Sequence, residues 1–132
     1  MISEKELFDL IEKLKEEENA LILVEGRRDA ESLRNIGVTS EIICISYRKI
    51  YDFTLDLIKK DKKIIILTDF DSKGTQLFKK YRKELESMGA NVDTKYYREL
   101  KHYLKKFVKG IEDIDSFLFT LQTSPPYSYN QE

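Results

Sequence analysis

The sequence predicts an α/β fold in three layers, with a four-stranded, mainly parallel sheet flanked by helices. Short continuous apolar runs, such as ALILV at 20–24 and KIIILT at 63–68, are typical of strands buried on both faces. Stretches with apolar residues three and four positions apart lie between these runs and indicate helices. The two patterns alternate along the chain, which favours parallel strands joined by right-handed crossovers.

Local signals place the ends of the elements. Ser3 and Glu6 have the spacing of a capping box and mark the start of the first helix. Asp29 is placed to cap the second helix, which Gly37 ends, and Gly89 ends the fourth. The expected elements are a helix at 3–18, a strand at 20–24, a helix at 30–35, a strand at 41–46, a helix at 50–60, a strand at 63–68, a helix at 75–88, a strand at 91–95, and helices at 97–108 and 113–121.

Length and composition indicate one globular domain. The chain has 132 residues, enough for one hydrophobic core and too few for two. Hydrophobic residues make up 41% of it, which is sufficient for a core although 36% of the residues are charged. We expect a single domain over residues 1–123, with its motifs within 19–95. The tail at 124–132 is polar and interrupted by proline, so we expect it to be flexible.

Several classes of protein and site are disfavoured by composition. The net charge is −1, so global charge argues neither for nor against nucleic acid. With Cys44 and His102 as single representatives of their types, a disulfide and a Cys/His metal cluster are excluded, and any metal must be held by oxygens. No apolar stretch is long enough to span a membrane, and the amino-terminal residues lack the pattern of a signal peptide. We therefore expect a cytoplasmic protein without membrane contact.

Three acidic residues follow two of the predicted strands. Glu25 follows the strand at 20–24, and Asp69 and Asp71 follow the strand at 63–68. Ligands of parallel α/β sheets bind beyond the carboxyl ends of the strands. If the strand order is 2-1-3-4, these strands are neighbours and the three carboxylates share one crevice. A divalent cation would relieve their mutual repulsion, and carboxylate oxygens with water are the ligands that Mg²⁺ prefers.

A glycine accompanies each acidic motif. Gly26 follows Glu25, and Gly74 lies three residues after Asp71. A missing side chain lets a phosphate approach the backbone and the amino end of the next helix. Any single acid at a strand end is often only a helix cap or a solvated turn. The combination of three acids with two glycines favours a functional site.

The two motifs resemble those of the Toprim domain, a Rossmann-like fold. The resemblance rests on VEG at 24–26 followed by Asp29, and on DxDxxG at 69–74. Topoisomerases, bacterial-type primases, OLD-family nucleases, recombination mediators and the ribonuclease M5 group share this domain. The match covers about 19–95, and the short chain resembles the small stand-alone Toprim proteins, many of them archaeal.

The resemblance implies a role for each acid. Glu25 matches the glutamate proposed as general acid or base, and it is also a candidate metal ligand. Asp69 and Asp71 match the aspartate pair that binds Mg²⁺, with Mn²⁺ as an alternative. We therefore expect these three to be the catalytic and metal-binding residues. Asp29 matches an acid in the first loop of many members and is a candidate accessory residue.

Candidate phosphate-binding residues lie in the motifs and in a basic stretch after them. The segment 95–109 has six lysines and arginines against one glutamate, a net charge of +5, with tyrosines interleaved. Such segments can bind phosphates and stack on bases, although a solvated amphipathic helix is an equally good interpretation. The candidates for contact with phosphate or nucleic acid are Gly26, Arg28, Lys73, Gly74 and Arg98.

The function implied by the resemblance is Mg²⁺-dependent phosphodiester chemistry on nucleic acid. A topoisomerase would need a tyrosine on a further domain, and a bacterial-type primase would need a zinc module, so a small nuclease acting on RNA or DNA is the interpretation that we favour. The alternative is a non-catalytic module that binds nucleic acid or protein within an RNA-processing or DNA-repair complex. A protein partner or a homodimer is left open.

Two other classes are less compatible with the order of the elements. The loop DFDSKGT at 69–75 is similar to the nucleophile loop of haloacid-dehalogenase-type phosphatases, but in those proteins it follows the first strand. Response-regulator receivers carry a pair of acids after the first strand, where this chain has Glu25 alone.

Overall fold

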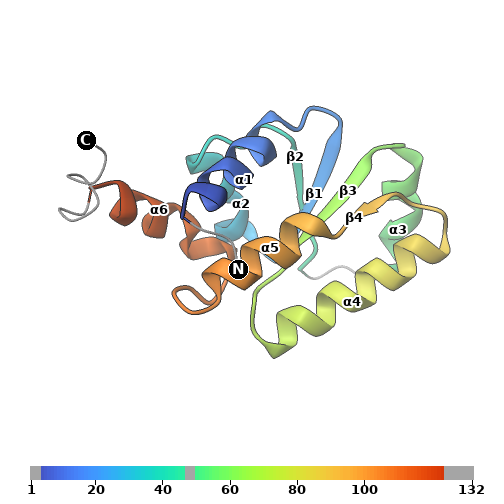
Figure 1. Ribbon diagram of the computed structural model, residues 1–132. Helices are drawn as coiled ribbons and strands as arrows, with labels where there is room; N and C mark the ends of the chain where they lie inside the picture. The colour runs from blue at the N-terminus through green and yellow to red at the C-terminus, as the bar shows by residue number, and fades with distance from the viewer. Residues whose placement is uncertain (1–3, 47–49, 124–132) are drawn as a thin grey trace.

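The computed structural model describes residues 4–46 and 50–123 (Figure 1). The cap expected at Ser3 and the tail expected at 124–132 lie outside the described residues, as do the side chains of 50–53.

The centre of the fold is a parallel sheet with the strand order β2-β1-β3-β4. All three pairs of neighbouring strands are parallel, and Val24 lies opposite Leu67 at the carboxyl ends of the central pair. The predicted fold class and the order 2-1-3-4 are therefore confirmed. The strands are β1 (Ala20–Val24), β2 (Glu41–Cys44), β3 (Lys63–Leu67) and β4 (Val92–Asp93).

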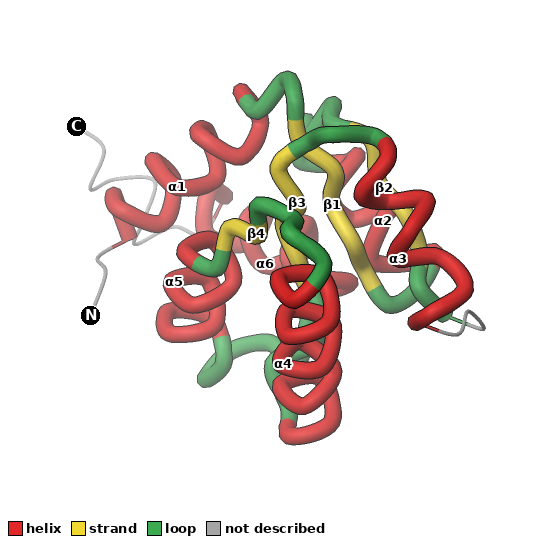
Figure 2. Tube along the Cα trace, turned by 90° about the vertical axis from the view of Figure 1, so that its right-hand side faces the viewer, coloured by secondary structure: helices red, strands yellow, loops and turns green. Residues whose placement is uncertain are grey.

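Helices cover both faces of the sheet, which gives the three layers. Two of them, α3 and α4, lie over one face, and α1, α2, α5 and α6 lie on the other side (Figures 1 and 2). This arrangement follows from right-handed crossovers, because the chain moves to one edge after β1 and back across the sheet after β2. The helices are α1 (Glu4–Glu16), α2 (Arg27–Asn35), α3 (Ile50–Lys59), α4 (Ser72–Ser87), α5 (Lys95–Leu104) and α6 (Ile114–Thr123), with a 3₁₀ turn η1 (Ile111–Asp113).

The hydrophobic core is centred on the two middle strands. Every residue of β1 is buried, as are the last four residues of β3. The apolar stripe of α1 packs on this core with Leu7 and Leu14 fully covered. Burial of both faces explains why these strands read as continuous apolar runs rather than alternating ones.

Several element boundaries differ from the sequence-based expectation, and the helix expected at 97–108 is found at Lys95–Leu104. Three further differences concern the two motifs and the fourth strand. The second helix begins at Arg27, so Gly26 is the N-cap residue and Asp29 is the third helical residue, whose side chain bonds back to the Gly26 N–H. The fourth helix begins at Ser72 because Asp71 caps it. The fourth strand is short because the Asp93 carboxylate accepts the backbone N–H groups at 95 and 96, which starts α5 early.

No helix within residues 4–46 and 50–123 is both long enough and apolar enough to cross a membrane.

Candidate functional site

Glu25 and Asp69 meet at the carboxyl ends of β1 and β3. These strands pair in register, so the residues that follow them leave the sheet at one edge. One carboxylate oxygen of Glu25, Oε2, accepts a hydrogen bond from the backbone N–H of Asp69 at 2.7 Å. The carbonyl of Glu25 accepts the N–H of Ser46 at 3.0 Å, which holds its backbone from the other side. The two sequence motifs are therefore in direct contact.

Asp71 begins the helix that follows this edge. Its Oδ1 accepts the backbone N–H of Gly74 at 2.7 Å, which is the geometry of a helix N-cap. The hydroxyl of Thr68 donates to the carbonyl of Gly74 at 2.7 Å. A Cβ at position 74 would overlap the backbone carbonyl of Asp69. Gly74 is therefore required for close packing of the motif loop on α4.

Asp29 and Gly26 form a second local cap at the start of α2. The Asp29 Oδ2 accepts the backbone N–H of Gly26 at 3.0 Å, and the side chain is buried. Burial raises the pKa of Asp29, the Gly26 hydrogen bond opposes this, and the nearby charges of Glu25 and Glu112 add to it. Asp29 thus contributes both helix capping and negative charge to the site.

Asp69 is the electrostatic centre of the site. Burial, followed by the negative charge of nearby carboxylates, raises the pKa of its side chain to about 7. These carboxylates belong to Glu25, Asp29, Asp71 and Glu112. Among the residues that the structure describes, none of these five acids forms an ion pair. No ion pair among the described residues therefore offsets the negative charge of this site.

The loop after α5 returns to this site, a contact that the sequence does not predict. The backbone N–H of Phe70 donates to the carbonyl of Lys109 at 2.9 Å. A Cβ at Gly110 would overlap Oδ1 of Asp69. Glu112, two residues later, adds its charge to Asp69 and Asp29. The only sequence signal for this contact was the isolated glycine.

The expected phosphate-binding residues are distributed over two places. Arg28 and Lys73 are exposed in the first turns of α2 and α4, beside the acidic motifs. Arg98 lies on α5 and lines a pocket between α4 and α5. The backbone N–H groups of Gly26 and Gly74 already donate to aspartates, so their part in phosphate binding stays a prediction.

The donor set fits a divalent cation in its chemistry. All candidate ligands are carboxylates, the oxygen donors that Mg²⁺ and Mn²⁺ take. Within residues 4–46 and 50–123, no three acidic, histidine or cysteine side chains are arranged closely enough to hold a metal ion by themselves. Asp71 uses Oδ1 for the cap, which leaves its second oxygen for a ligand. The candidate ligands for such an ion are Asp69 and Asp71, with Glu25 as the third.

Comparison with known proteins gives the same family. The family model of the Toprim domain matches residues 20–112. A UPF0292 protein of Thermococcus gammatolerans is 46% identical over 110 residues, covering 83% of this chain and 81% of that protein. The UPF0292 protein of Pyrococcus horikoshii is 44% identical over 119 residues, covering 89% of both. The UPF0292 protein of Methanocaldococcus jannaschii is 38% identical over 116 residues, covering 86% of this chain and 91% of that protein.

A solved structure supports the fold independently. A protein from Aquifex aeolicus superposes with a TM-score of 0.70 at 30% identity, covering 81% of this chain and 96% of its own. Toprim domains typically bind divalent metal ions such as Mg²⁺. The motif residues, their meeting at one edge of the sheet and these comparisons agree: the chain belongs to the Toprim domain family, whose function is metal-dependent and related to nucleic acids.

Proposed function

We propose that this protein is a small Mg²⁺-dependent nuclease that hydrolyses phosphodiester bonds of RNA or DNA. The observation that carries the proposal is the hydrogen bond from the Asp69 backbone to the Glu25 carboxylate at 2.7 Å. It joins the two Toprim motifs into one site at the switch point of the sheet, where α/β folds bind ligands. The uncompensated acids around it match a reaction centre that works with a cation.

In this proposal, Asp69 and Asp71 would bind the metal ion and Glu25 would act as the general base or acid. A bound Mg²⁺ would offset charge on the phosphate and favour deprotonation of an attacking water. Glu25 is fixed by its bond to the Asp69 backbone, which leaves Oε1 to take a proton from water or to bind the ion through water. Arg28 and Lys73, exposed in the adjoining helix turns, are placed to contact the phosphate.

Substitution of Glu25 by glutamine tests the catalytic role. The amide keeps an oxygen for the Asp69 N–H but loses the base. We expect turnover of a labelled oligonucleotide to fall about 10²- to 10⁴-fold while substrate binding stays within about twofold. Glu18→Gln is the matched control, because Glu18 is exposed and lies just before the opposite end of β1. A Glu25→Gln protein with unchanged turnover would refute the assignment.

The alternative is a non-catalytic binding module, and one set of contacts favours it. Asp29 and Asp71 both act as local helix caps, so part of the acidic motif has a structural use. If that is their whole role, cleavage is absent in wild type and variants alike, and Glu25→Gln changes nothing. Loss of turnover with retained binding separates the enzyme from the binding module.

A further inference from the structure

A pocket of about 300 Å³ lies between α4 and α5. The two helices are neighbours in both ribbon views, beyond the short strand β4 (Figures 1 and 2). The described residues that line it include no carboxylate. Its basic side chains come from both helices and from the residue after α5: Lys79, Arg82, Arg98, Lys101, His102 and Lys105.

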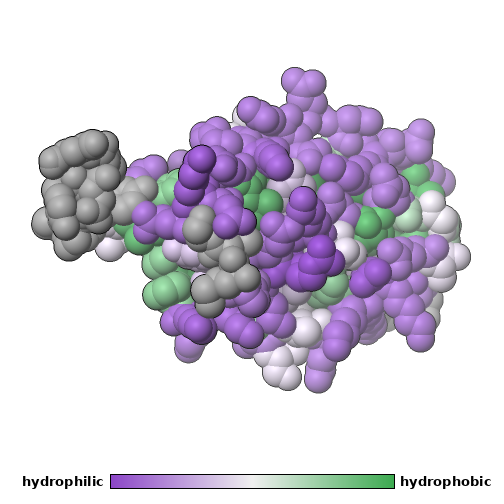
Figure 3. All heavy atoms as spheres, in the orientation of Figure 1, coloured by the Kyte–Doolittle hydropathy of each residue, from purple (hydrophilic) through white to green (hydrophobic). Residues whose placement is uncertain are grey.

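Most of this positive charge is free to meet a ligand. Lys79, Arg98 and Lys105 are exposed, and none of them forms an ion pair with the described residues. Arg82 shares its charge with Glu86, at 3.3 Å on the same helix. Figure 3 shows that hydrophilic residues predominate on the face presented by α4 and α5. The pocket is therefore a local positive site on a protein whose net charge is −1.

An aromatic pair lies against the same pocket. Phe78 of α4 and Tyr97 of α5 stack with ring centroids 4.2 Å apart and an angle of 12° between the planes. The Nζ of Lys101 lies 5.9 Å from the centre of the Tyr97 ring and donates to the hydroxyl of Thr75 at 2.6 Å. Both rings are largely buried, so they offer an apolar floor to the pocket rather than an open stacking face. Cations around an apolar pocket floor suit a nucleotide unit, whose phosphate the cations can contact while its sugar lies over the floor.

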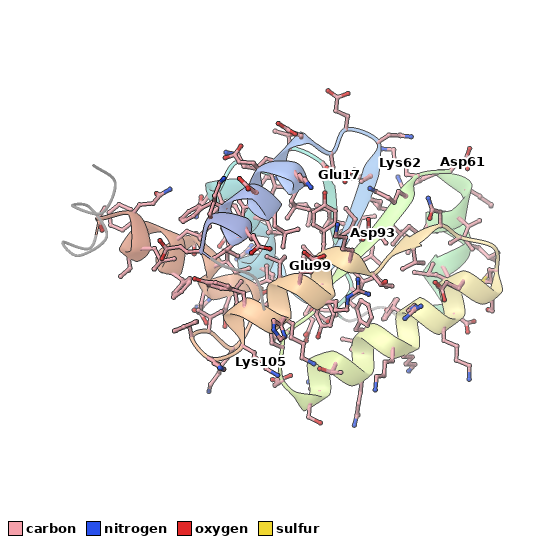
Figure 4. All side chains as sticks on the ribbon, in the orientation of Figure 1. Glu17, Asp61, Lys62, Asp93, Glu99 and Lys105 are labelled. Atoms are coloured by element: carbon pink, nitrogen blue, oxygen red, sulfur yellow. The ribbon has the colours of Figure 1, made fainter. Side chains whose placement is uncertain are left out.

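Tyr97 also connects the pocket to the acidic site. Its hydroxyl donates to the backbone carbonyl of Asp69 at 2.7 Å. Asp69, the first residue of the DxD motif, is thus linked by one hydrogen bond to a residue that lines the pocket. Figure 4 shows Lys105 at the carboxyl end of α5, near the start of α4, so positive charge extends toward the edge where the motif loop leaves the sheet.

We propose that the α4–α5 pocket binds single-stranded nucleic acid and leads it to the Glu25–Asp69 site, an inference that rests on the proposed nuclease function. Phosphates lie between Lys79, Arg98 and Lys105, and one nucleotide is seated over Phe78 and Tyr97. A single strand fits because its sugars and nucleobases can enter a pocket of this size. In a duplex the nucleobases are paired inside the helix and cannot reach the floor of the pocket.

The larger pocket on the other side of the molecule does not offer the same chemistry. It measures about 590 Å³ and lies among α1, α2 and α6. Its charged lining is mixed, with Glu12 and Asp115 beside Lys15. Acids in that position disfavour a polyanion, so the positive α4–α5 pocket is the better site for nucleic acid.

Two triple variants with the same net charge test the proposed role of the pocket. Lys79→Gln/Arg98→Gln/Lys105→Gln removes three lining cations. Lys80→Gln/Lys83→Gln/Lys106→Gln removes three exposed cations from the same helix and adjoining turn that do not line the pocket. Binding of a labelled single-stranded oligonucleotide of about 12 nucleotides is measured by fluorescence anisotropy in EDTA, which prevents metal-dependent cleavage.

We expect the pocket variant to bind about 10- to 100-fold more weakly than the control variant. The slope of log K against log salt should fall by about 2 in magnitude in the pocket variant, because each phosphate contact to a single strand contributes about 0.7. An unlabelled duplex of equal length should compete poorly. Equal affinities of the two triple variants would contradict nucleic-acid binding at the pocket. Equal competition by the duplex would contradict its preference for single strands.

The same variants distinguish this inference from the nuclease proposal. If wild type cleaves nucleic acid and the pocket variant has an unchanged KM, the pocket proposal is wrong and the nuclease proposal is supported. If the pocket variant loses binding while no protein cleaves with any metal, the pocket stands and the nuclease is wrong. Circular dichroism of both variants confirms that the surface substitutions leave the fold intact.

Discussion

The carboxylate of Asp69 carries an electrostatic cost that the fold accepts without a compensating cation among its described residues. Because burial and four neighbouring acids raise its pKa to about 7, the folded protein binds a proton there more tightly than the unfolded chain does. The free energy of unfolding therefore falls as pH rises from about 4 to about 7 and remains lower above that range. A metal ion at this position would offset the cost.

Replacement of Asp69 by asparagine tests this cost. We expect Asp69→Asn to be more stable than wild type at pH 8 without metal, by about 1 to 2 kcal/mol after allowance for solvent screening. The gain should shrink toward zero at pH 4, where the wild-type side chain is protonated in the folded protein and about half protonated in the unfolded chain. Urea unfolding in EDTA at the two pH values measures it, with Asp56→Asn, an exposed acid on α3, as control. A variant that is less stable at pH 8 would contradict the electrostatic account.

Two glycines contact Asp69 in different ways, and alanine substitutions should separate them. A Cβ at Gly110 meets the Asp69 side chain, which can rotate away, whereas a Cβ at Gly74 meets the Asp69 backbone, which cannot. We expect Gly110→Ala to lose metal-dependent activity at least about tenfold with a change in stability below about 1 kcal/mol. Gly74→Ala should lose stability by about 1 to 3 kcal/mol, as overpacking does. Thermal melts and cleavage assays on both proteins check this, and the reverse pattern would contradict it.

At the scale of the elements, Asp71 has two separable roles. Its Oδ1 caps α4 through the Gly74 N–H, and its charge belongs to the acidic site. Asparagine retains a capping oxygen, whereas alanine does not. We expect Asp71→Ala to cost about 0.5 to 2 kcal/mol of stability and Asp71→Asn to cost a few tenths at most.

Both Asp71 substitutions should weaken metal binding, because each removes the charge. Chemical unfolding with and without Mg²⁺ separates the two roles. Equal stability of the alanine and asparagine proteins would show that the cap contributes nothing, and retention of Mg²⁺ stabilisation in both would remove Asp71 from the metal site.

The limits of sequence-based prediction are also seen at the level of elements. The buried strands were predicted at or within two residues of their ends because burial on both faces leaves unbroken apolar runs, as in β1 and β3. Helix starts were less well predicted, since α2 and α4 begin at caps formed by Gly26 and Asp71, which looked like loop residues in the motifs. A local pattern does not reveal which residue of an acidic loop is the cap.

For the whole molecule, the meeting of Glu25 with Asp69 was predictable once the strand order was assumed, because parallel neighbours end at one edge. Two features were not predictable. The loop that brings Gly110 and Glu112 to Asp69 depends on how α5 packs back on β3. The α4–α5 pocket depends on contacts between helices that follow different strands, and Arg98 gains its setting only from that packing.

Mg²⁺ should stabilise the whole fold if the acids bind it. We expect Mg²⁺ at concentrations above its dissociation constant to raise the melting temperature of wild type. At one hundred times the dissociation constant, the free energy of unfolding should increase by about 2.7 kcal/mol. Asp69→Asn/Asp71→Asn should lose this response while melting at or above the wild-type temperature in EDTA. Differential scanning calorimetry with and without Mg²⁺ measures both effects. An unchanged response in the double variant would place the ion elsewhere.

The most direct measurement is a cleavage assay on labelled RNA and DNA, single-stranded and duplex, with Mg²⁺, Mn²⁺ or EDTA, using wild type beside Asp69→Asn/Asp71→Asn. We expect cleavage of single-stranded RNA or DNA that requires Mg²⁺ or Mn²⁺, stops in EDTA and is absent from the double variant. Folded wild-type protein that cleaves none of these substrates with either metal would contradict the nuclease assignment, and cleavage that persists in the double variant would contradict the site.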